Sequence, residues 1–183
     1  MQSDVYGNYS SDFIQKLETQ VDVFIRHLYR NYRNPKPIAE CANKLYPKQK
    51  LAVPSRDFKS YPNFKTFEHR KDELKTLRNE VTNLLKQGVS FQDITVLTFA
   101  SQKSSHLHEL TEISGISFTS SNIEDKAIYW HQIGAFKGLE NEVIIVTEVP
   151  MGALDKRRAE YFVALTRTRT DLIIICHKNT GKN

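Results

Sequence analysis

The chain has 183 residues, of which 39% are hydrophobic and 26% are charged, a composition that favours one folded domain and excludes an intrinsically disordered chain. No apolar run approaches the ~18 residues of a membrane span, and the polar start of the chain lacks the pattern of a signal peptide. We therefore expect a cytoplasmic protein without membrane contact. Cys41 and Cys176 are far apart and lack zinc-site spacing, so we expect buried thiols and no metal site.

The positive charge is concentrated in one part of the sequence. The net charge is +5, and the stretch from Arg26 to Lys59 holds nine basic residues against two acidic ones. Local clustering of this kind is typical of proteins that bind polyanions, because basic side chains near phosphates release condensed counterions. Lys44, Lys48 and Lys50 lie in this stretch and are candidate nucleic-acid contacts. The alternative is an ordinary solvated basic surface.

The first third of the chain predicts two helices and a connector. Apolar residues recur at helical spacing over residues 13–28 after several N-cap residues, which predicts a helix over residues 10–29. A second helix is expected from Pro37, because proline is favoured in the first helical turn, and to end at Tyr46-Pro47. Residues 47–63 contain three prolines and are expected to be an irregular connector.

The remainder alternates between helical and strand patterns. Helical spacing predicts helices over residues 69–87, 102–113 and 156–168, and β-branched or apolar runs predict strands over residues 93–99, 116–118, 128–133, 142–149 and 171–176. Strands that alternate with helices indicate βαβ units, and therefore an α/β fold with a mainly parallel central sheet covered on both faces. Since ligands of such sheets usually bind beyond the carboxyl ends of strands, we expect the chemistry at that edge.

Several catalytic motifs are absent from the sequence. There is no GxxxxGK[ST] phosphate loop, and no acidic pair follows an apolar strand to hold magnesium, since Asp72-Glu73 lies in a charged helix and is expected to be solvated. There is no GxSxG serine-hydrolase motif. The run His106-Leu107-His108-Glu109 lacks the HExxH spacing of a zinc site. The chain therefore shows no complete catalytic apparatus of its own.

Three short segments carry a more specific signal. They are Leu28-Tyr29-Arg30-Asn31-Tyr32-Arg33, then Phe136-Lys137-Gly138-Leu139-Glu140, and then Tyr161-Phe162-Val163-Ala164-Leu165-Thr166-Arg167-Thr168-Arg169. In this order, and each at the boundary of a predicted element, they resemble motifs IV, V and VI of the UvrD/Rep-type superfamily 1 helicases. Lys137-Gly138-Leu139-Glu140 stands where helicases of the Upf type usually have Gln-Gly-Arg-Glu, which favours the UvrD branch and DNA.

The resemblance implies a fold and a division of labour. It implies the three-layer RecA-like fold of the P-loop NTPase type, with residues 1–30 as a helical lead-in, residues 31–178 as the second RecA-like domain of a helicase and residues 179–183 as a tail. In that family the second domain faces the first across an ATP site, with Mg²⁺ held mainly by the first. We therefore expect the N-terminal RecA-like domain and single-stranded or duplex DNA, or RNA, as partners, and no ATPase activity from this chain alone.

The resemblance also assigns roles to single residues. Arg33 and Arg167 match the family's γ-phosphate contacts, Tyr32 its adenine-stacking aromatic residue, and Glu140 its ribose-binding acid. Gly138 is expected to allow close backbone approach.

Lys137 is a candidate contact to phosphate or nucleic acid. The structural alternatives are a surface cation for Arg33, a core-edge aromatic for Tyr32, a turn cap for Glu140 and a helix-end salt bridge for Arg167. For Arg169, a solvated cation at a helix end is as good an explanation as a functional role.

Two other functions remain open from the sequence. The chain could be a stand-alone nucleic-acid-binding or regulatory module of RecA-like fold that has no ATPase activity. A nucleotide-binding α/β enzyme of another type would need catalytic residues that the sequence does not contain.

Overall fold

The computed structural model describes residue 19 and residues 30–47, 53–56, 58, 60–121 and 126–180. Apart from Thr19, the predicted helix over residues 10–29 lies outside the described residues, as do Lys48, Lys50 and residues 181–183. None of the described helices has the length and apolar character of a membrane span.

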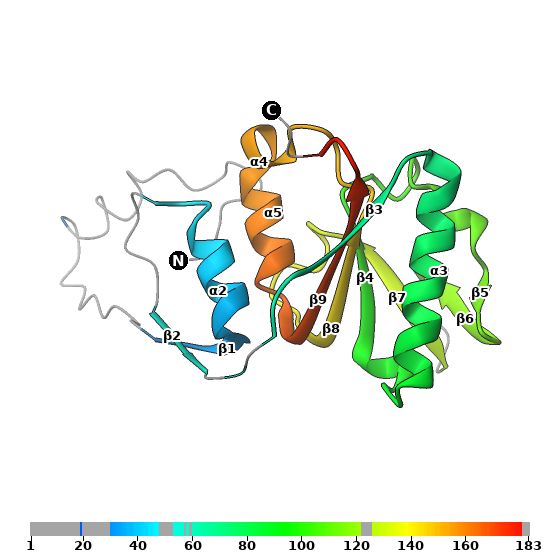
Figure 1. Cartoon of the computed structure of the whole chain (residues 1–183), viewed down its shortest axis with the longest axis horizontal. Helices are drawn as coiled ribbons and strands as arrows, with labels where there is room; N and C mark the ends of the chain where they lie inside the picture. Colours follow the sequence, from blue (N-terminus) through cyan, green and yellow to red (C-terminus); the bar gives the residue numbers. More distant parts are fainter. Residues whose placement is uncertain are drawn as a thin grey trace.

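A seven-stranded sheet forms the centre of the domain, in the order β3-β9-β8-β4-β7-β6-β5 (Figure 1). Its strands are β3 (Asn63–Phe67), β4 (Ile94–Thr98), β5 (Glu112–Ile113), β6 (Ile116–Thr119), β7 (Ala127–Gln132), β8 (Asn141–Thr147) and β9 (Thr168–His177). All neighbouring strands are parallel except the short β5, which is antiparallel to β6. The predicted strands are therefore confirmed, and the sheet is mainly parallel as expected.

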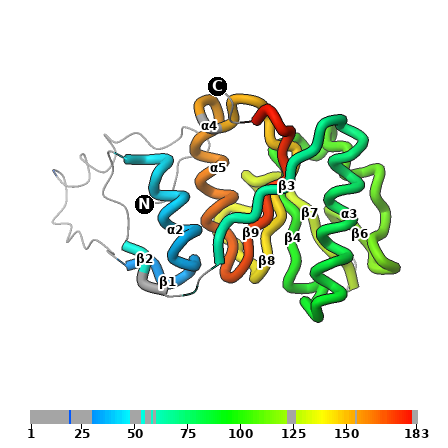
Figure 2. The backbone as a smooth tube through the Cα atoms, viewed as in Figure 1, coloured from blue at the N-terminus to red at the C-terminus, as the bar shows by residue number. Residues whose placement is uncertain are grey.

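Helices cover both faces of this sheet. On one face α3 (Arg70–Lys86) packs against the strands, and on the other face α2 (Lys36–Asn43) and α5 (Arg158–Leu165) pack against them (Figures 1 and 2). Side chains of β8 alternate between the two cores, since Ile144 and Val146 face α5 while Val143 and Ile145 face α3. Burial on both faces explains the nearly continuous apolar run of this strand. The three-layer α/β fold is thus as predicted.

Two of the predicted helices are wrong in detail. Residues 102–113 form a 3₁₀ turn, His106–Glu109, followed by β5, instead of a helix. The hydroxyl groups of Ser101 and Ser105 accept nearby backbone N–H groups, which competes with helical hydrogen bonding. The predicted helix over residues 156–168 is divided into α4 (Ala153–Lys156) and α5, because Arg157 leaves the helical conformation.

Besides β5, three further strands were not predicted. β1 (Arg30–Pro35) and β2 (Val53–Arg56) form a separate two-stranded parallel sheet, and β3 lies at the edge of the main sheet. The expectation that residues 47–63 are wholly irregular is therefore wrong. These segments contain or adjoin prolines and have many polar residues, so their sequences do not show a strand pattern. Proline is tolerated in strands only at edges or bulges, and β1 has such an irregularity before Pro35.

A buried group of charged side chains fixes the carboxyl edge of the central strands. The imidazole of His106 lies between two glutamates, with Nδ1 at 2.5 Å from Glu148 Oε1 and Nε2 at 3.2 Å from Glu73 Oε2. Hydrogen bonds to Glu148 and Glu73 raise the pKa of His106 from 6.5 to about 9. Burial by itself would raise the pKa of Glu148, but hydrogen bonds from His106, Ser105 and Thr98 lower it to about 2. At neutral pH this group therefore contains an imidazolium between two carboxylates.

This arrangement predicts a stability that depends on pH. Because the pKa of His106 is higher in the folded state, its contribution is complete below pH 6.5 and is lost as the pH rises towards 9. The free energy of unfolding should therefore fall by up to ~1.4 kcal/mol per pH unit across this range. Urea unfolding at several pH values measures the slope, and His106→Gln should flatten it. Equal slopes in both proteins would contradict the assignment.

Candidate nucleotide-facing site

The second and third motifs meet at the amino edge of the sheet. Glu140 immediately precedes β8, and Arg167 immediately precedes β9. These strands are parallel neighbours with Asn141 opposite Thr168, and Asn141 N donates to Arg167 O at 3.2 Å. The pairing therefore places the two motif ends side by side. This edge is opposite to the carboxyl edge where the general rule for parallel sheets predicted the chemistry, because both motifs come before their strands.

An asparagine pair attaches the first motif to the same edge. Asn34 is buried, and its Nδ2 donates to Thr168 O at 2.7 Å, which joins β1 to the start of β9. Asn31 Oδ1 accepts the backbone N–H groups of Arg33 at 2.9 Å and Asn34 at 3.2 Å, and its Nδ2 donates to Asn34 Oδ1 at 3.0 Å. The backbone that carries Arg33 is therefore held against β9 by side-chain amides.

Glu140 lies between two arginines. Its Oε2 is 2.5 Å from Arg33 Nε, and its Oε1 is 3.8 Å from Arg169 Nε. Arg169 Nη1 is also 3.2 Å from Glu142 Oε1. The structure thus brings Arg33 and Glu140 together, and it places Arg169 in β9 beside them instead of at a helix end.

The guanidinium of Arg167 is oriented by three acceptors of the protein itself. Its Nε donates to Val163 O at 3.3 Å, Nη1 to Leu139 O at 3.4 Å and Nη2 to Thr166 Oγ1 at 3.3 Å. Burial lowers the pKa of Arg167, the cation of Arg33 lowers it further, and Glu140 opposes both. An arginine remains protonated at any physiological pH. The site therefore combines the oriented guanidinium of Arg167 with a second guanidinium, that of Arg33, which is close enough to lower the pKa of Arg167.

The other predicted residues that the structure describes are Tyr32 in β1, Lys137 and Gly138 in the loop before β8, and Lys44 after α2. Tyr32 is 65% exposed, and its hydroxyl group accepts from Arg30 Nη1 at 3.4 Å. Lys137 is half-buried in the loop before β8, and Lys44 is exposed after the end of α2. Gly138 has φ +93°, with open space where a Cβ would be. Its backbone conformation therefore requires glycine, and the close approach expected from the sequence is wrong.

The sequence reasoning missed some residues that build this site. Asn31 and Asn34 were given no role, although they position Arg33, and Glu142 was treated only as part of a strand. An Asn-x-x-Asn-Pro pattern beside an arginine is the signal that could have indicated a local side-chain turn. The described residues contain no group of three or more His, Cys, Asp or Glu side chains able to hold a metal ion.

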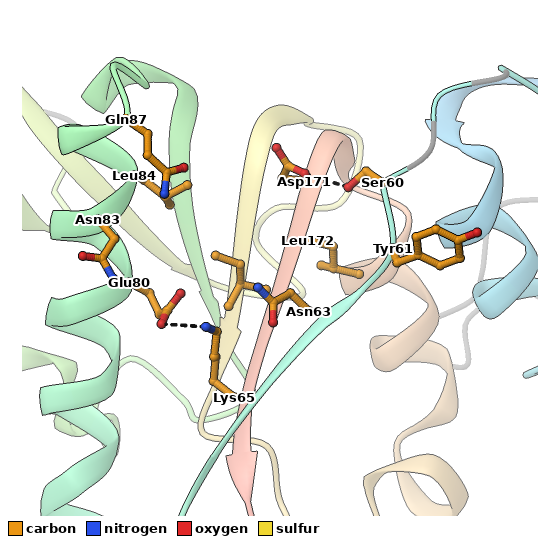
Figure 3. A pocket seen from close by; sticks show the side chains of 11 residues that line it. Ser60, Tyr61, Asn63, Lys65, Glu80, Asn83, Leu84, Gln87, Asp171 and Leu172 are labelled. Atoms are coloured by element: carbon orange, nitrogen blue, oxygen red, sulfur yellow. Dashed lines mark hydrogen bonds and ion pairs between the residues drawn. The ribbon is translucent and has the colours of Figure 1, made fainter.

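A polar groove of about 450 Å³ lies elsewhere, between α3 and strands β3 and β9 (Figure 3). Lys65 Nζ and Glu80 Oε1 meet at 3.1 Å, and Ser60 Oγ donates to Asp171 Oδ1 at 2.6 Å (Figure 3). Among the predicted site residues that the structure describes, none lines this groove. Its carboxylates, Glu80 and Asp171, make it unsuitable for a polyphosphate.

Comparison with known proteins agrees with this architecture. Residues 57–179 match the AAA_12 family, described as "AAA domain". The chain belongs to this AAA domain family. The match contains Glu140 and Arg167 but not Tyr32 or Arg33. No curated protein matches the sequence.

Among solved structures, this AAA domain is similar to the C-terminal domain of a possible DNA helicase from Lactobacillus plantarum WCFS1. The two have a TM-score of 0.57 and 15% sequence identity, over 80% of this chain and 88% of the other. At this identity the likeness is one of fold. The AAA domain therefore has the fold of a helicase C-terminal RecA-like domain, as the sequence predicted.

The asparagine connection can be tested by mutation. Asn34→Ala removes the donor to the carbonyl of Thr168 and leaves that buried acceptor without it. The loss should lower the free energy of unfolding by about 1–3 kcal/mol, measured by urea unfolding. Lys36→Ala, at an exposed neighbouring position, is the control and should change stability little. Equal effects of the two substitutions would show that the hydrogen bond does not hold β1 to β9.

Proposed function

We propose that this AAA domain is the second motor domain of an ATP-dependent DNA helicase or translocase of the UvrD/Rep type. The observation that carries the proposal is the convergence of Arg33, Glu140 and Arg167 at one edge of the sheet, from three segments far apart in the sequence. A surface used only for solubility has no need of a half-buried, oriented arginine next to a second arginine and an acid.

The chemistry of these residues suits the γ-phosphate end of a nucleotide. In phosphoryl transfer negative charge develops on the equatorial oxygens, and a guanidinium supplied from a facing domain neutralises it. Arg167 is oriented for this role by its three acceptors, and Arg33 is attached to the same edge. ATP with Mg²⁺ is the proposed cofactor, with the ion held by the partner domain.

The remaining contacts of the nucleotide follow from exposure and hydrogen-bonding capacity. The exposed ring of Tyr32 is available to stack on adenine, and the carboxylate of Glu140 can accept ribose hydroxyl groups. Glu140 is paired with Arg33 here, so binding would exchange this ion pair for contacts to ribose and phosphate. Gly138 would shape the loop that carries Glu140.

The proposal requires a partner domain. The sequence contains no phosphate loop, and the AAA domain by itself therefore has no group to hold the β-phosphate. An N-terminal RecA-like domain of the same protein would supply it and would close on Arg33 and Arg167 when ATP binds. This chain alone is then expected to hydrolyse no ATP.

The decisive experiment measures ATP turnover in a polypeptide that joins this domain to its N-terminal RecA-like domain, with and without single-stranded DNA. Arg167→Ala should lower turnover by ~10³-fold while ATP still binds, because its charge acts mainly in the transition state. Arg158→Ala, at the opposite end of α5, is the matched control and should retain turnover.

The results of this experiment distinguish a helicase motor domain from a nucleic-acid-binding or regulatory module. Wild-type turnover in Arg167→Ala would overturn the arginine-finger assignment. If the joined protein binds DNA but hydrolyses no ATP, the domain is instead a nucleic-acid-binding or regulatory module. If single-stranded RNA stimulates ATP turnover and single-stranded DNA does not, the nucleic-acid substrate is RNA and the proposal of DNA is wrong.

Four lysines, Lys44, Lys48, Lys50 and Lys137, are proposed to contact the nucleic acid. Lys44 is exposed after α2, whereas Lys48 and Lys50 lie outside the described residues, and Lys137 lies in the loop before β8. Neutralising Lys44, Lys48 and Lys50 together should reduce the slope of log affinity against log salt by up to ~2 for a single strand.

The salt titration has a control on the opposite face of the sheet. Lys71, Lys75 and Lys86 are exposed on α3, and their replacement by alanine removes the same number of charges. An equal loss of slope in both triple variants would show a general charge effect and contradict a specific track.

A further inference from the structure

The carboxylate of Glu148 is surrounded by hydrogen-bond donors at the carboxyl edge of the sheet. Its Oε2 accepts from the hydroxyl groups of Thr98 and Ser105, the latter at 2.6 Å. Its Oε1 accepts the backbone N–H of His106 at 2.9 Å and lies 2.5 Å from His106 Nδ1. Four donors on one carboxylate are the arrangement of an anion-binding site.

All four donors come from one stretch of chain, residues 98–106, and the two hydroxyl groups also make hydrogen bonds that do not involve Glu148. Thr98 Oγ1 accepts the N–H of Ala100 at 2.8 Å, and Ser105 Oγ accepts the N–H of Leu107 at 3.2 Å. Each hydroxyl oxygen is thus occupied as an acceptor, which leaves its hydrogen to be donated to an anion. We call Thr98, Ser105 and His106 the anion cradle.

The anion cradle lies where the sheet diverges. The connection after β4 turns to the face of α3, where Leu107 is buried, and the connection after β8 turns to the face of α5, where Val149 is buried. In open parallel sheets the crevice between two such strands is the usual place for a ligand. Here a side chain of the protein itself occupies it.

Charges around the anion cradle also favour an anion. His106 lies between Glu148 and Glu73, and Arg70 Nη2 is 3.3 Å from His106 Nδ1. With Glu148 present, two carboxylates face two cations. Removal of Glu148 takes one negative charge away from the cradle while Arg70 remains beside it, so the local charge becomes more favourable to an external anion.

Glu148 enters the anion cradle in an unusual backbone conformation. Its φ is +52°, and its backbone N–H donates to Glu73 Oε1 at 2.7 Å. Glu73 also accepts from Thr147 Oγ1 at 2.8 Å, so the backbone of this turn is held independently of the Glu148 carboxylate. Removal of the carboxylate should therefore leave the turn and the cradle in place.

We propose that Thr98, Ser105 and His106 form a binding site for a small oxyanion, a carboxylate or a phosphate group, which the carboxylate of Glu148 fills as an internal plug. An external oxyanion takes the same four donors when Glu148 is absent or displaced. This site is at the opposite edge from the candidate nucleotide-facing site, and it does not depend on the proposed function.

The test uses Glu148→Gly, because glycine adopts positive φ without strain and opens the anion cradle. Thermal unfolding at pH 7 is followed while sodium formate, and separately sodium phosphate, is added at ionic strength held constant with sodium chloride. At formate ~10 times its Kd, the folded-to-unfolded ratio should rise about 11-fold. The amide resonances of Ser105 and His106 should shift along the same titration.

Two further proteins serve as controls. The wild-type chain and Glu148→Gln both keep the anion cradle filled and should respond to neither anion. Glu148→Gly/Ser105→Ala removes one donor and should bind formate more weakly. If Glu148→Gly does not fold, Glu148→Asn replaces it, because asparagine tolerates positive φ and its shorter side chain leaves room for the anion.

The outcomes decide the proposal. Stabilisation of the glycine or asparagine variant by formate or phosphate, without stabilisation of the wild type, supports an oxyanion site. The anion that stabilises the variant at the lower concentration is the one that the site prefers. Equal stabilisation of all variants indicates a general salt effect and overturns it. No response in a folded variant shows that Glu148 is only a structural brace.

Discussion

The parallel pairing of β8 with β9 is the constraint on which the candidate site depends. Because Asn141 lies opposite Thr168, the residues just before these strands, Glu140 and Arg167, come side by side. At the start of β9, the carbonyl oxygen of Thr168 accepts a hydrogen bond from the side-chain amide of Asn34, which brings the neighbouring Arg33 to the same edge. A shift of this pairing by one residue would move every buried side chain of β8 to the other face, so the two hydrophobic cores keep the register and thereby the site.

The charged side chains at the two edges of the sheet differ in their exposure to solvent. At the amino edge, Arg33, Glu140 and Arg169 are partly exposed, so their ion pairs can be exchanged for a ligand at small cost. At the carboxyl edge, His106 and Glu148 are buried and multiply hydrogen-bonded. Removal of His106 there would leave the buried carboxylate of Glu148 without its charged partner, which is costly. The first edge is suited to reversible binding and the second to holding the turns around β4 and β8 in place.

Predictions from the sequence succeeded where one local property decides the structure. The apolar runs of β4, β8 and β9 can only be buried strands, and the spacing of Leu77, Val81 and Leu84 can only form one buried helix face. Predictions failed where distant groups decide. β3 has a mainly polar sequence, and it pairs with β9 at the edge of the sheet. Arg157 lies where the predicted helix is interrupted, and its guanidinium donates to the distant Phe99 O at 2.7 Å.

The sequence by itself determined the α/β class, the succession of buried strands along the chain and the identity of the motif residues. These are fixed by periodicity and by short motifs, which are local properties of the chain. Only the tertiary structure decided that Arg33, Glu140 and Arg167 meet, that the meeting point is the amino edge, and that Glu148 fills a cradle formed by residues 98–106. The physical reason is that these contacts join residues many positions apart. Their distances depend on strand order and register, which are set by the burial of both faces of the sheet together.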